Sequence, residues 1–160
     1  MQPDTIAVID VDGVVADVRH RLPLLRRHPP RWDLFFAAAD GDPLLEVGAE
    51  LVTKLAEEHT VVWLSGRPER LRAVTEDWLA RHDLPDGRLE LRRPRDYRPA
   101  RLMKLERILL LARDATVAAV VDDDPDVVAT LTQAGYPAVL AEWVPHQKTL
   151  HRAQERDGRT

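Results

Sequence analysis

Three short apolar runs end abruptly in polar residues, and this pattern constrains the fold more than any other feature of the sequence. The runs at 6–9, 61–64 and 117–121 lead directly into Asp10, Ser65 and Asp122. Apolar runs of this length, separated by stretches of helical periodicity, are typical of parallel strands that are buried on both faces. A further short strand is expected at 138–140.

The stretches between these runs carry apolar residues on one helical face. One such face comprises Leu102, Leu105, Ile108, Leu109 and Ala112. A later helix is expected to begin at Pro125, which suits a first turn, and to stop at Gly135. Alternating strands and helices predict an α/β fold, a Rossmann-like three-layer sandwich around a central, mostly parallel sheet.

Two segments do not follow this alternation. The first, at about 14–43, is an arginine- and proline-rich insertion, and the second, at 146–160, is predicted to be a loose helix or a frayed polar tail. The rest of residues 1–145 is expected to form one domain, since 160 residues with 44% hydrophobic content can build a single core.

Composition narrows the class of protein. The chain lacks a basic start followed by an apolar stretch, and its apolar runs are too short for a membrane span, so a soluble, cytoplasmic protein without a membrane partner is expected. It has no cysteine, so a metal must be held by oxygen or imidazole.

Positive charge is concentrated locally, although the net charge is −4. Two basic stretches comprise Arg19, Arg21, Arg26, Arg27 and Arg31, and then Arg88, Arg92, Arg93, Arg95, Arg98, Arg101 and Lys104. Clusters of this kind either bind phosphate groups or form a solvated surface.

The first predicted strand ends in Asp10-Val11-Asp12-Gly13, which places two carboxylates two residues apart beside a glycine. One carboxylate can attack phosphorus and form an aspartyl-phosphate, while the other protonates the leaving oxygen and later activates water. Such a pair needs a cation, and Mg²⁺ prefers oxygen ligands. Asp122 and Asp123 supply further oxygens if their strand lies beside the first. Asp124 and Asp126 are expected to serve as helix N-terminal residues instead.

The second strand ends in Ser65-Gly66-Arg67, which offers hydroxyl, backbone and guanidinium donors to a phosphate. Lys104 can supply a point charge to the phosphoryl group.

The order of these residues resembles the four motifs of the haloacid dehalogenase (HAD) superfamily of phosphohydrolases. The resemblance implies Asp10 as nucleophile, Asp12 as acid/base and Ser65 with Lys104 as phosphate binders. It also implies a Mg²⁺ held by Asp10, the backbone carbonyl of Asp12, Asp122 and Asp123.

A narrower resemblance is to the 3′-phosphatase domain of polynucleotide kinase/phosphatase enzymes, carried by Ser65-Gly66-Arg67, by Asp96-Tyr97-Arg98 and by Asp122-Asp123. It implies that Gly66, Arg67 and Arg98 help to hold the substrate, a DNA or RNA 3′ end, and leaves a partner kinase or ligase unidentified. Two departures are Ala100-Arg101 in place of an acidic residue and Val14 in place of threonine. Val14 is shared with 5′(3′)-deoxyribonucleotidases.

The insertion at 14–43 is too short for a substantial cap domain, and an open site suits a polymer end. Its aromatic residues Trp32, Phe35 and Phe36 either stack on a base or pack the insertion on the sheet, and burial is favoured for the Phe pair.

Three alternatives to a polynucleotide phosphatase remain at this stage. The first is a nucleotidase that uses the same residues. The second is a response-regulator receiver, which keeps its acidic pair on the first strand rather than on a late one. The third is a module that binds phosphorylated ends without turnover.

Overall fold

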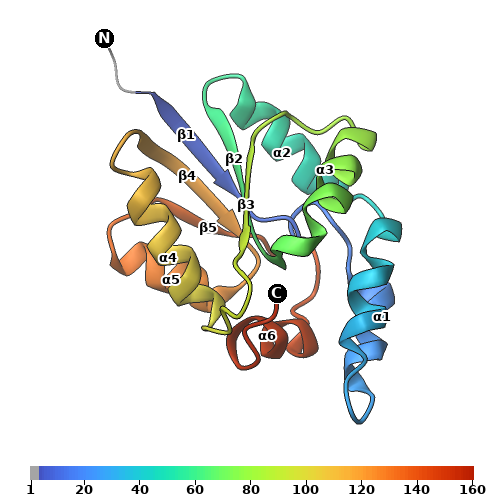
Figure 1. Ribbon diagram of the computed structural model, residues 1–160. Helices are drawn as coiled ribbons and strands as arrows, with labels where there is room; N and C mark the ends of the chain where they lie inside the picture. The colour runs from blue at the N-terminus through green and yellow to red at the C-terminus, as the bar shows by residue number, and fades with distance from the viewer. Residues whose placement is uncertain (1–3) are drawn as a thin grey trace.

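The computed structural model describes residues 4–160, so the first three residues of the expected 1–145 domain lie outside it. Its centre is a five-stranded sheet in the order β3-β2-β1-β4-β5, and every pairing is parallel (Figure 1). The strands are β1 (Thr5–Ile9), β2 (Thr60–Pro68), β3 (Arg88–Arg92), β4 (Thr116–Asp122) and β5 (Ala138–Leu140).

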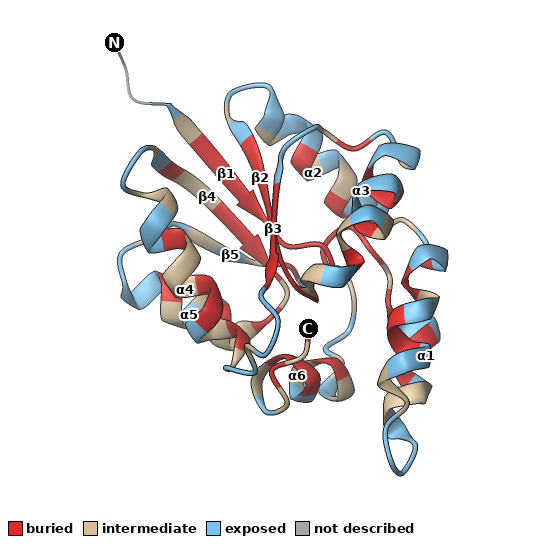
Figure 2. Ribbon diagram, in the orientation of Figure 1, coloured by how far each residue is buried: buried red, intermediate tan, exposed pale blue. Residues whose placement is uncertain are grey.

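Helices cover both faces of this sheet, which confirms the three-layer sandwich (Figure 2). One face packs against α2 (Glu46–Ala56) and α3 (Arg72–Arg81), and its core includes Trp63 and Trp78. The other face packs against α4 (Ala100–Leu111) and α5 (Pro125–Gln133), through Met103 and Leu131 among others. Strand side chains alternate between these two cores, which is why the runs are apolar throughout.

The buried face of α4 differs from the one expected. Ala100, Met103, Lys104 and Ile108 are buried, whereas Leu102 and Leu109 are exposed. Positions i, i+3, i+4 and i+8 define this face, and a charged lysine stands in the middle of it. The helical periodicity predicted the wrong face because α4 also carries leucines on the side that faces away from the sheet.

Strand β3 was missed by the sequence reasoning. Its sequence is Arg-Leu-Glu-Leu-Arg, and it pairs with β2 alone at the edge of the sheet. Charged residues interrupt the apolar run that marks the central strands, so an edge strand of this composition resembles a loop.

Helix α5 begins as expected. Pro125 occupies its first turn, and the Asp124 side chain accepts a hydrogen bond from the Asp126 backbone N–H at 2.9 Å. This confirms that Asp124 is the helix N-cap.

The insertion folds into short helical segments that share a small core with Leu71 and Leu150. The segments are η1 (Arg19–Arg26), α1 (Trp32–Ala37) and η2 (Ala38–Gly41). Phe35 and Phe36 are buried with Leu22, Leu71 and Leu150. The expected burial of the Phe pair is therefore confirmed, and neither ring is free to stack on a base. The pair packs against Leu71 and Leu150, however, in a cluster that contains no strand residue.

The end of the chain is not a loose tail. Residues 148–155 form helix α6, in which Leu150, Ala153 and Gln154 are buried, and the following turn brings Thr160 back under the sheet edge (Figure 1). Few apolar side chains drive this docking, which is why the polar composition concealed it. Within the described part of the chain, no helix combines the length and apolar character needed to cross a bilayer.

Candidate active site

The carboxyl ends of β1, β2 and β4 lie at the same edge of the sheet. The strand order reverses at β1, because β2 and β3 lie on one side of it and β4 and β5 on the other. Asp10 follows β1, Ser65 lies in β2, and Asp122 ends β4. In doubly wound sheets this reversal point is where ligands bind. The topology thus brings together three of the residues that the sequence analysis singled out.

Lys104 joins this group from α4 and is only 2% exposed. Its Nζ donates to Asp122 Oδ2 at 2.6 Å and lies 3.2 Å from Asp10 Oδ1. Burial by itself would lower the pKa of Lys104, but the charges of Asp10 and Asp122 raise it above its usual value. The lysine is therefore a fixed positive charge between two carboxylates.

Asp10 is 3% exposed, and its two oxygens have different surroundings. Oδ1 accepts a hydrogen bond from the Val11 backbone N–H at 2.8 Å, whereas Oδ2 has no partner within residues 4–160. Burial and the nearby charge of Asp122 raise the pKa of Asp10 well above its usual range. An unpaired buried oxygen is costly, so this atom is where a ligand is expected to bind.

Oxygens of Asp10, Asp122 and Asp123 lie within 4.8 Å of one another. Burial and, after it, the charge of Asp122 raise the pKa of Asp123 to about 7. Gly13, at φ +79°, leaves room for them, because a Cβ there would stand 2.2 Å from Asp123 Oδ2. The all-oxygen donor set and the unpaired Asp10 oxygen fit a hard divalent cation.

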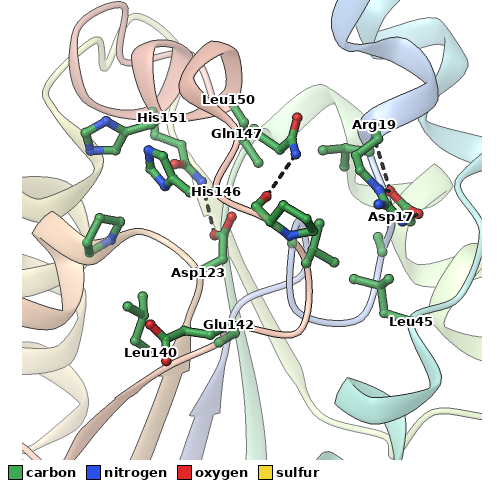
Figure 3. Close-up of a pocket in the computed structure, with 18 residues that line it drawn as sticks. Asp17, Arg19, Leu45, Asp123, Leu140, Glu142, His146, Gln147, Leu150 and His151 are labelled. Carbon is green, nitrogen blue, oxygen red and sulfur yellow. Dashed lines mark hydrogen bonds and ion pairs between the residues drawn. The ribbon is translucent and has the colours of Figure 1, made fainter.

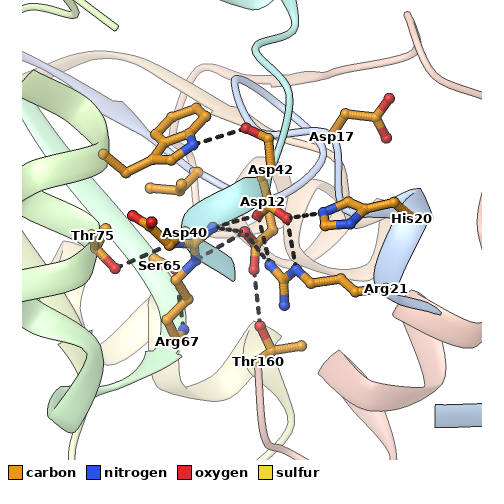
Figure 4. A network of polar contacts seen from close by, with 12 residues as sticks. Asp12, Asp17, His20, Arg21, Asp40, Asp42, Ser65, Arg67, Thr75 and Thr160 are labelled. Atoms are coloured by element: carbon orange, nitrogen blue, oxygen red, sulfur yellow. Dashed lines mark hydrogen bonds and ion pairs between the residues drawn. The ribbon is translucent and has the colours of Figure 1, made fainter. Parts of the chain in front are cut away.

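The Asp12 side chain lies in a buried network of charges (Figure 4). Arg67 donates to Asp12 Oδ1 from Nη2 at 2.7 Å and from Nε at 2.9 Å. Thr160 Oγ1 donates to the other oxygen, Oδ2, at 3.1 Å. Burial by itself would raise the pKa of Asp12, but Arg67 and Arg21 outweigh it and lower the pKa to about 2.

Asp42 completes this network and was missed by the sequence reasoning. It is 3% exposed and accepts hydrogen bonds from Arg21 Nε at 2.8 Å and from Arg67 Nη2 at 3.0 Å. Arg21 stood in a basic stretch that the sequence analysis noted, but Asp42 lies between a glycine and a proline in the insertion and carries no motif. Asp42 comes close to Arg67 only through the way the insertion folds.

The remaining phosphate-binding candidates divide into two groups. Ser65 Oγ accepts from the Arg67 backbone N–H at 3.1 Å, and Gly66 lies directly against Thr160, so both lie beside the charge network around Asp12. Arg98 does not, because its guanidinium is half-exposed and pairs with Asp96 and Glu106. The structure therefore leaves Arg98 outside the cluster.

Helix α6 and the residues after it close the site. Gln154 Nε2 donates to Asp123 Oδ1 at 3.2 Å, and a Cβ on Gly66 would lie 2.2 Å from the Thr160 carbonyl carbon. Asp123 borders a pocket between the insertion and the start of α6, with Arg19 on one side and His146 on the other (Figure 3). The C-terminal segment therefore covers part of this edge of the sheet.

The parallel sheet, the Asp-x-Asp motif after β1 and the late acidic pair define a phosphohydrolase of the haloacid dehalogenase class. Residues 4–141 match the family described as the polynucleotide kinase PNKP phosphatase domain. The match covers most of the chain, which therefore belongs to this family of HAD-type phosphatases. The match ends before α6.

Solved structures agree with this assignment. A chain of "Structure of the Pnkp1/Rnl/Hen1 RNA repair complex" is 25% identical with a TM-score of 0.71, covering 86% of this protein and 42% of that chain. A second structure of the Pnkp1/Rnl/Hen1 complex gives 24% identity and a TM-score of 0.74, over 88% and 46%.

A more distant structure shares the fold. A putative haloacid dehalogenase-like hydrolase from Burkholderia xenovorans LB400 is 13% identical with a TM-score of 0.59, over 87% of this protein and 81% of that chain. The protein thus spans less than half of the two repair-complex chains but most of this hydrolase. No curated protein sequence matches it.

Proposed function

We propose that this protein is a Mg²⁺-dependent phosphomonoesterase that acts through an aspartyl-phosphate on Asp10 and removes the 3′-phosphate from a polynucleotide end. The observation that carries the proposal is Asp10 Oδ2, a buried carboxylate oxygen without a partner among the described residues. It belongs to a side chain held in place by Lys104 and by the Val11 backbone N–H.

Asp10, Asp122, Asp123 and the backbone carbonyl of Asp12 are the groups that would hold Mg²⁺. When bound, the ion screens the repulsion between the Asp10 carboxylate and an anionic phosphate. Lys104 contributes a second positive charge that belongs to the protein itself.

In the first step, an Asp10 oxygen attacks phosphorus, and the bond from phosphorus to the ester oxygen breaks. Asp12 is ionised in this conformation, so it takes up a proton from solvent once it has turned away from Arg67, and it gives that proton to the leaving oxygen. Ser65, the Gly66 backbone and Lys104 hold the phosphoryl oxygens. Asp12 is held by Arg67 and Thr160 in this conformation, so its side chain turns toward the leaving oxygen once the substrate displaces Thr160.

In the second step, water attacks the phosphorus of the aspartyl-phosphate and the bond to Asp10 breaks. Asp12 takes the proton from that water, inorganic phosphate is released and Asp10 is a carboxylate again; Asp12 returns its proton to solvent when it pairs with Arg67 once more. Arg67 and Arg21 stabilise the ionised form of Asp12, the form that can accept this proton.

Two observations support a polynucleotide as substrate. The insertion is a small packed unit and not a cap domain, and the family match is to a polynucleotide kinase phosphatase domain. The repair-complex structures add RNA as a candidate polymer and place a relative of this protein beside other repair components. A ligase or kinase is therefore the kind of partner that we propose.

Steady-state phosphate release tests the proposal on a 3′-phosphorylated oligonucleotide and on deoxynucleoside monophosphates, each with Mg²⁺ or with EDTA. We expect release only with Mg²⁺, and kcat/KM for the oligonucleotide to exceed that for monophosphates by roughly tenfold or more, or about 1.4 kcal/mol. A clear preference for monophosphates would reassign the site to a nucleotidase.

Opening the C-terminal segment is expected to speed turnover of a small ester. Gly158 has φ +59°, and a Cβ there would stand 2.1 Å from the Tyr97 carbonyl oxygen, so Gly158→Val pushes the segment away. The segment is held by hydrogen bonds of about 1 kcal/mol each, so kcat/KM for p-nitrophenyl phosphate should rise roughly tenfold.

Gly41→Val is the matched control, since a Cβ at Gly41 has no neighbour within 4 Å. It should leave this rate unchanged. An equal or lower rate in Gly158→Val, with the fold intact by circular dichroism, would show that the segment does not limit access.

A further inference from the structure

A second feature at the same edge of the sheet is a hollow surface rich in arginine. Its residues come from the end of β2, from the loop between β3 and α4, and from the C-terminal segment. We call Arg70, Arg93, Arg95, Arg159 and Tyr97 the arginine surface. It corresponds in part to the second basic stretch of the sequence.

The positive charge of this surface is available to a ligand. Arg70, Arg93, Arg95 and Arg159 form no ion pair within residues 4–160, and the first three are exposed. The acidic side chains lining the hollow are already paired, Glu69 with Arg72 and Asp96 with Arg98. In a chain of net charge −4, this is a local excess of positive charge that suits a polyanion.

The surface is also held in shape. Arg92 is buried and donates from Nη1 to the backbone oxygens of Asp96 at 3.2 Å and of Arg98 at 2.7 Å, which fixes the loop between β3 and α4. Tyr97 projects from this loop with 57% of its surface exposed. A fixed aromatic ring among arginines can stack on a base while the guanidinium groups contact the backbone.

The C-terminal segment runs from this surface to the active site. The Arg159 guanidinium lies 5.1 Å from the ring centroids of Trp32 and Tyr97, and the next residue, Thr160, donates to Asp12. The Thr160 backbone oxygen lies 3.5 Å from Arg92 Nη2. Residues 158–160 therefore already occupy the path from the arginine surface to Asp12.

The pocket beside Asp123 offers a second approach, but its charge is unfavourable for a polyanion. Asp17, Asp123 and Glu142 line it, and its arginine, Arg19, is paired with Asp17 at 2.7 Å. A negatively charged strand is repelled there and attracted on the arginine side.

We infer that the arginine surface binds the backbone of a single-stranded nucleic acid just upstream of its 3′ end, with the terminal nucleotide entering along the path that residues 158–160 occupy. This inference rests on the proposed function, because it assigns the polymer segment next to the phosphate that Asp10 would attack. It adds a binding surface, with Tyr97 as the stacking residue and Arg93 and Arg95 as backbone contacts.

Fluorescence anisotropy with a labelled single-stranded RNA decamer that ends in a 3′-hydroxyl tests the surface without any chemistry. The pair Arg93→Ala/Arg95→Ala should weaken binding by roughly tenfold, and the salt dependence of log Kd should become shallower by roughly 0.7 per lost phosphate contact. Tyr97→Ala should weaken binding to a similar extent through lost stacking, roughly tenfold, and Tyr97→Phe should restore it.

The control pair Lys54→Ala/Arg113→Ala removes the same charge from exposed side chains near the opposite edge of the sheet, where β2 and β4 begin. It should bind like the unmodified protein. The Arg93→Ala/Arg95→Ala pair and the control pair should hydrolyse p-nitrophenyl phosphate to within about twofold of the unmodified rate, since that ester is too small to reach these side chains.

The outcomes separate the two claims. If Arg93→Ala/Arg95→Ala binds the RNA as tightly as the control pair Lys54→Ala/Arg113→Ala does, the arginine surface does not bind the strand. The phosphatase assignment would remain in place. Equal binding of polyglutamate and RNA would also overturn it. Arginine-dependent RNA binding without hydrolysis of any ester would support the surface and refute the proposed function.

Discussion

Asp10→Asn is expected to lower the rate of Mg²⁺-dependent phosphate release by roughly 10⁴-fold or more, because an amide cannot form the acyl-phosphate. The geometry of the site should survive this change. Asn has the shape of Asp, and Lys104 keeps its 2.6 Å contact with Asp122. Single-turnover assays with a 3′-phosphorylated oligonucleotide measure the loss over the full range.

The same substitution should stabilise the protein in the absence of divalent ions. Asp10 is buried beside Asp122 and Asp123, and burial raises its pKa, so removing its charge relieves repulsion that the fold otherwise tolerates. Asp114→Asn is the matched control, since Asp114 is exposed and lies at the opposite edge of the sheet, before β4.

Activity of Asp10→Asn above about one per cent of the unmodified rate would contradict a nucleophilic Asp10.

The central part of this site could be predicted from sequence for a specific physical reason. Parallel strands that are buried on both faces must be apolar along their length, so the first polar residue after each run marks the edge of the sheet. Asp10, Ser65 and Asp122 are such residues, and the topology brings them together. Lys104 was recognisable by its order relative to these motifs.

The outer part of the site could not be predicted, because it depends on how irregular segments fold back. Asp42 and Thr160 lie far from Asp12 in sequence, and neither belongs to a periodic pattern. Strand β3 was hidden because alternating charges mask an edge strand. Helix α6 was hidden because it docks mainly through Leu150, Ala153 and polar contacts such as Gln154 with Asp123.

Part of this outer region, which includes Gln154 and Thr160, lies beyond the family match, which ends at residue 141. Residues 142–160 nevertheless supply Gln154 and Thr160, which contact Asp123 and Asp12. A shared phosphatase core therefore carries a C-terminal segment that covers it. The arginine surface draws Arg159 from that segment, so access to the site and polymer binding are coupled through the same residues.

The buried network around Asp12 gives the second large expected effect, which is on stability. Asp42→Asn should lower the free energy of unfolding by about 3 kcal/mol, since it leaves Arg21 and Arg67, both fully buried, with one carboxylate fewer to balance their charges. Urea denaturation followed by circular dichroism measures the loss. Asp40→Asn is the control, because Asp40 is exposed and its ion pair with Arg81 should contribute at most about 0.5 kcal/mol. A loss below about 1 kcal/mol for Asp42→Asn would show that the arginines find other partners.

A double substitution separates stability from function in this network. Arg21→Met/Asp42→Leu removes a buried charge pair together and fills its place with apolar side chains, so much of the stability lost in Asp42→Asn should return. Phosphatase activity should not return with it. Arg67 would keep its bond to Asp12 but lose Asp42, the second carboxylate to which its Nη2 donates. Asp12 would lose the nearby charge of Arg21 that helps to keep it ionised. A stable but slow double variant would mean that these buried charges are arranged to orient and ionise Asp12, at some expense in stability. A double variant as fast as the unmodified protein would mean that Arg67 alone suffices.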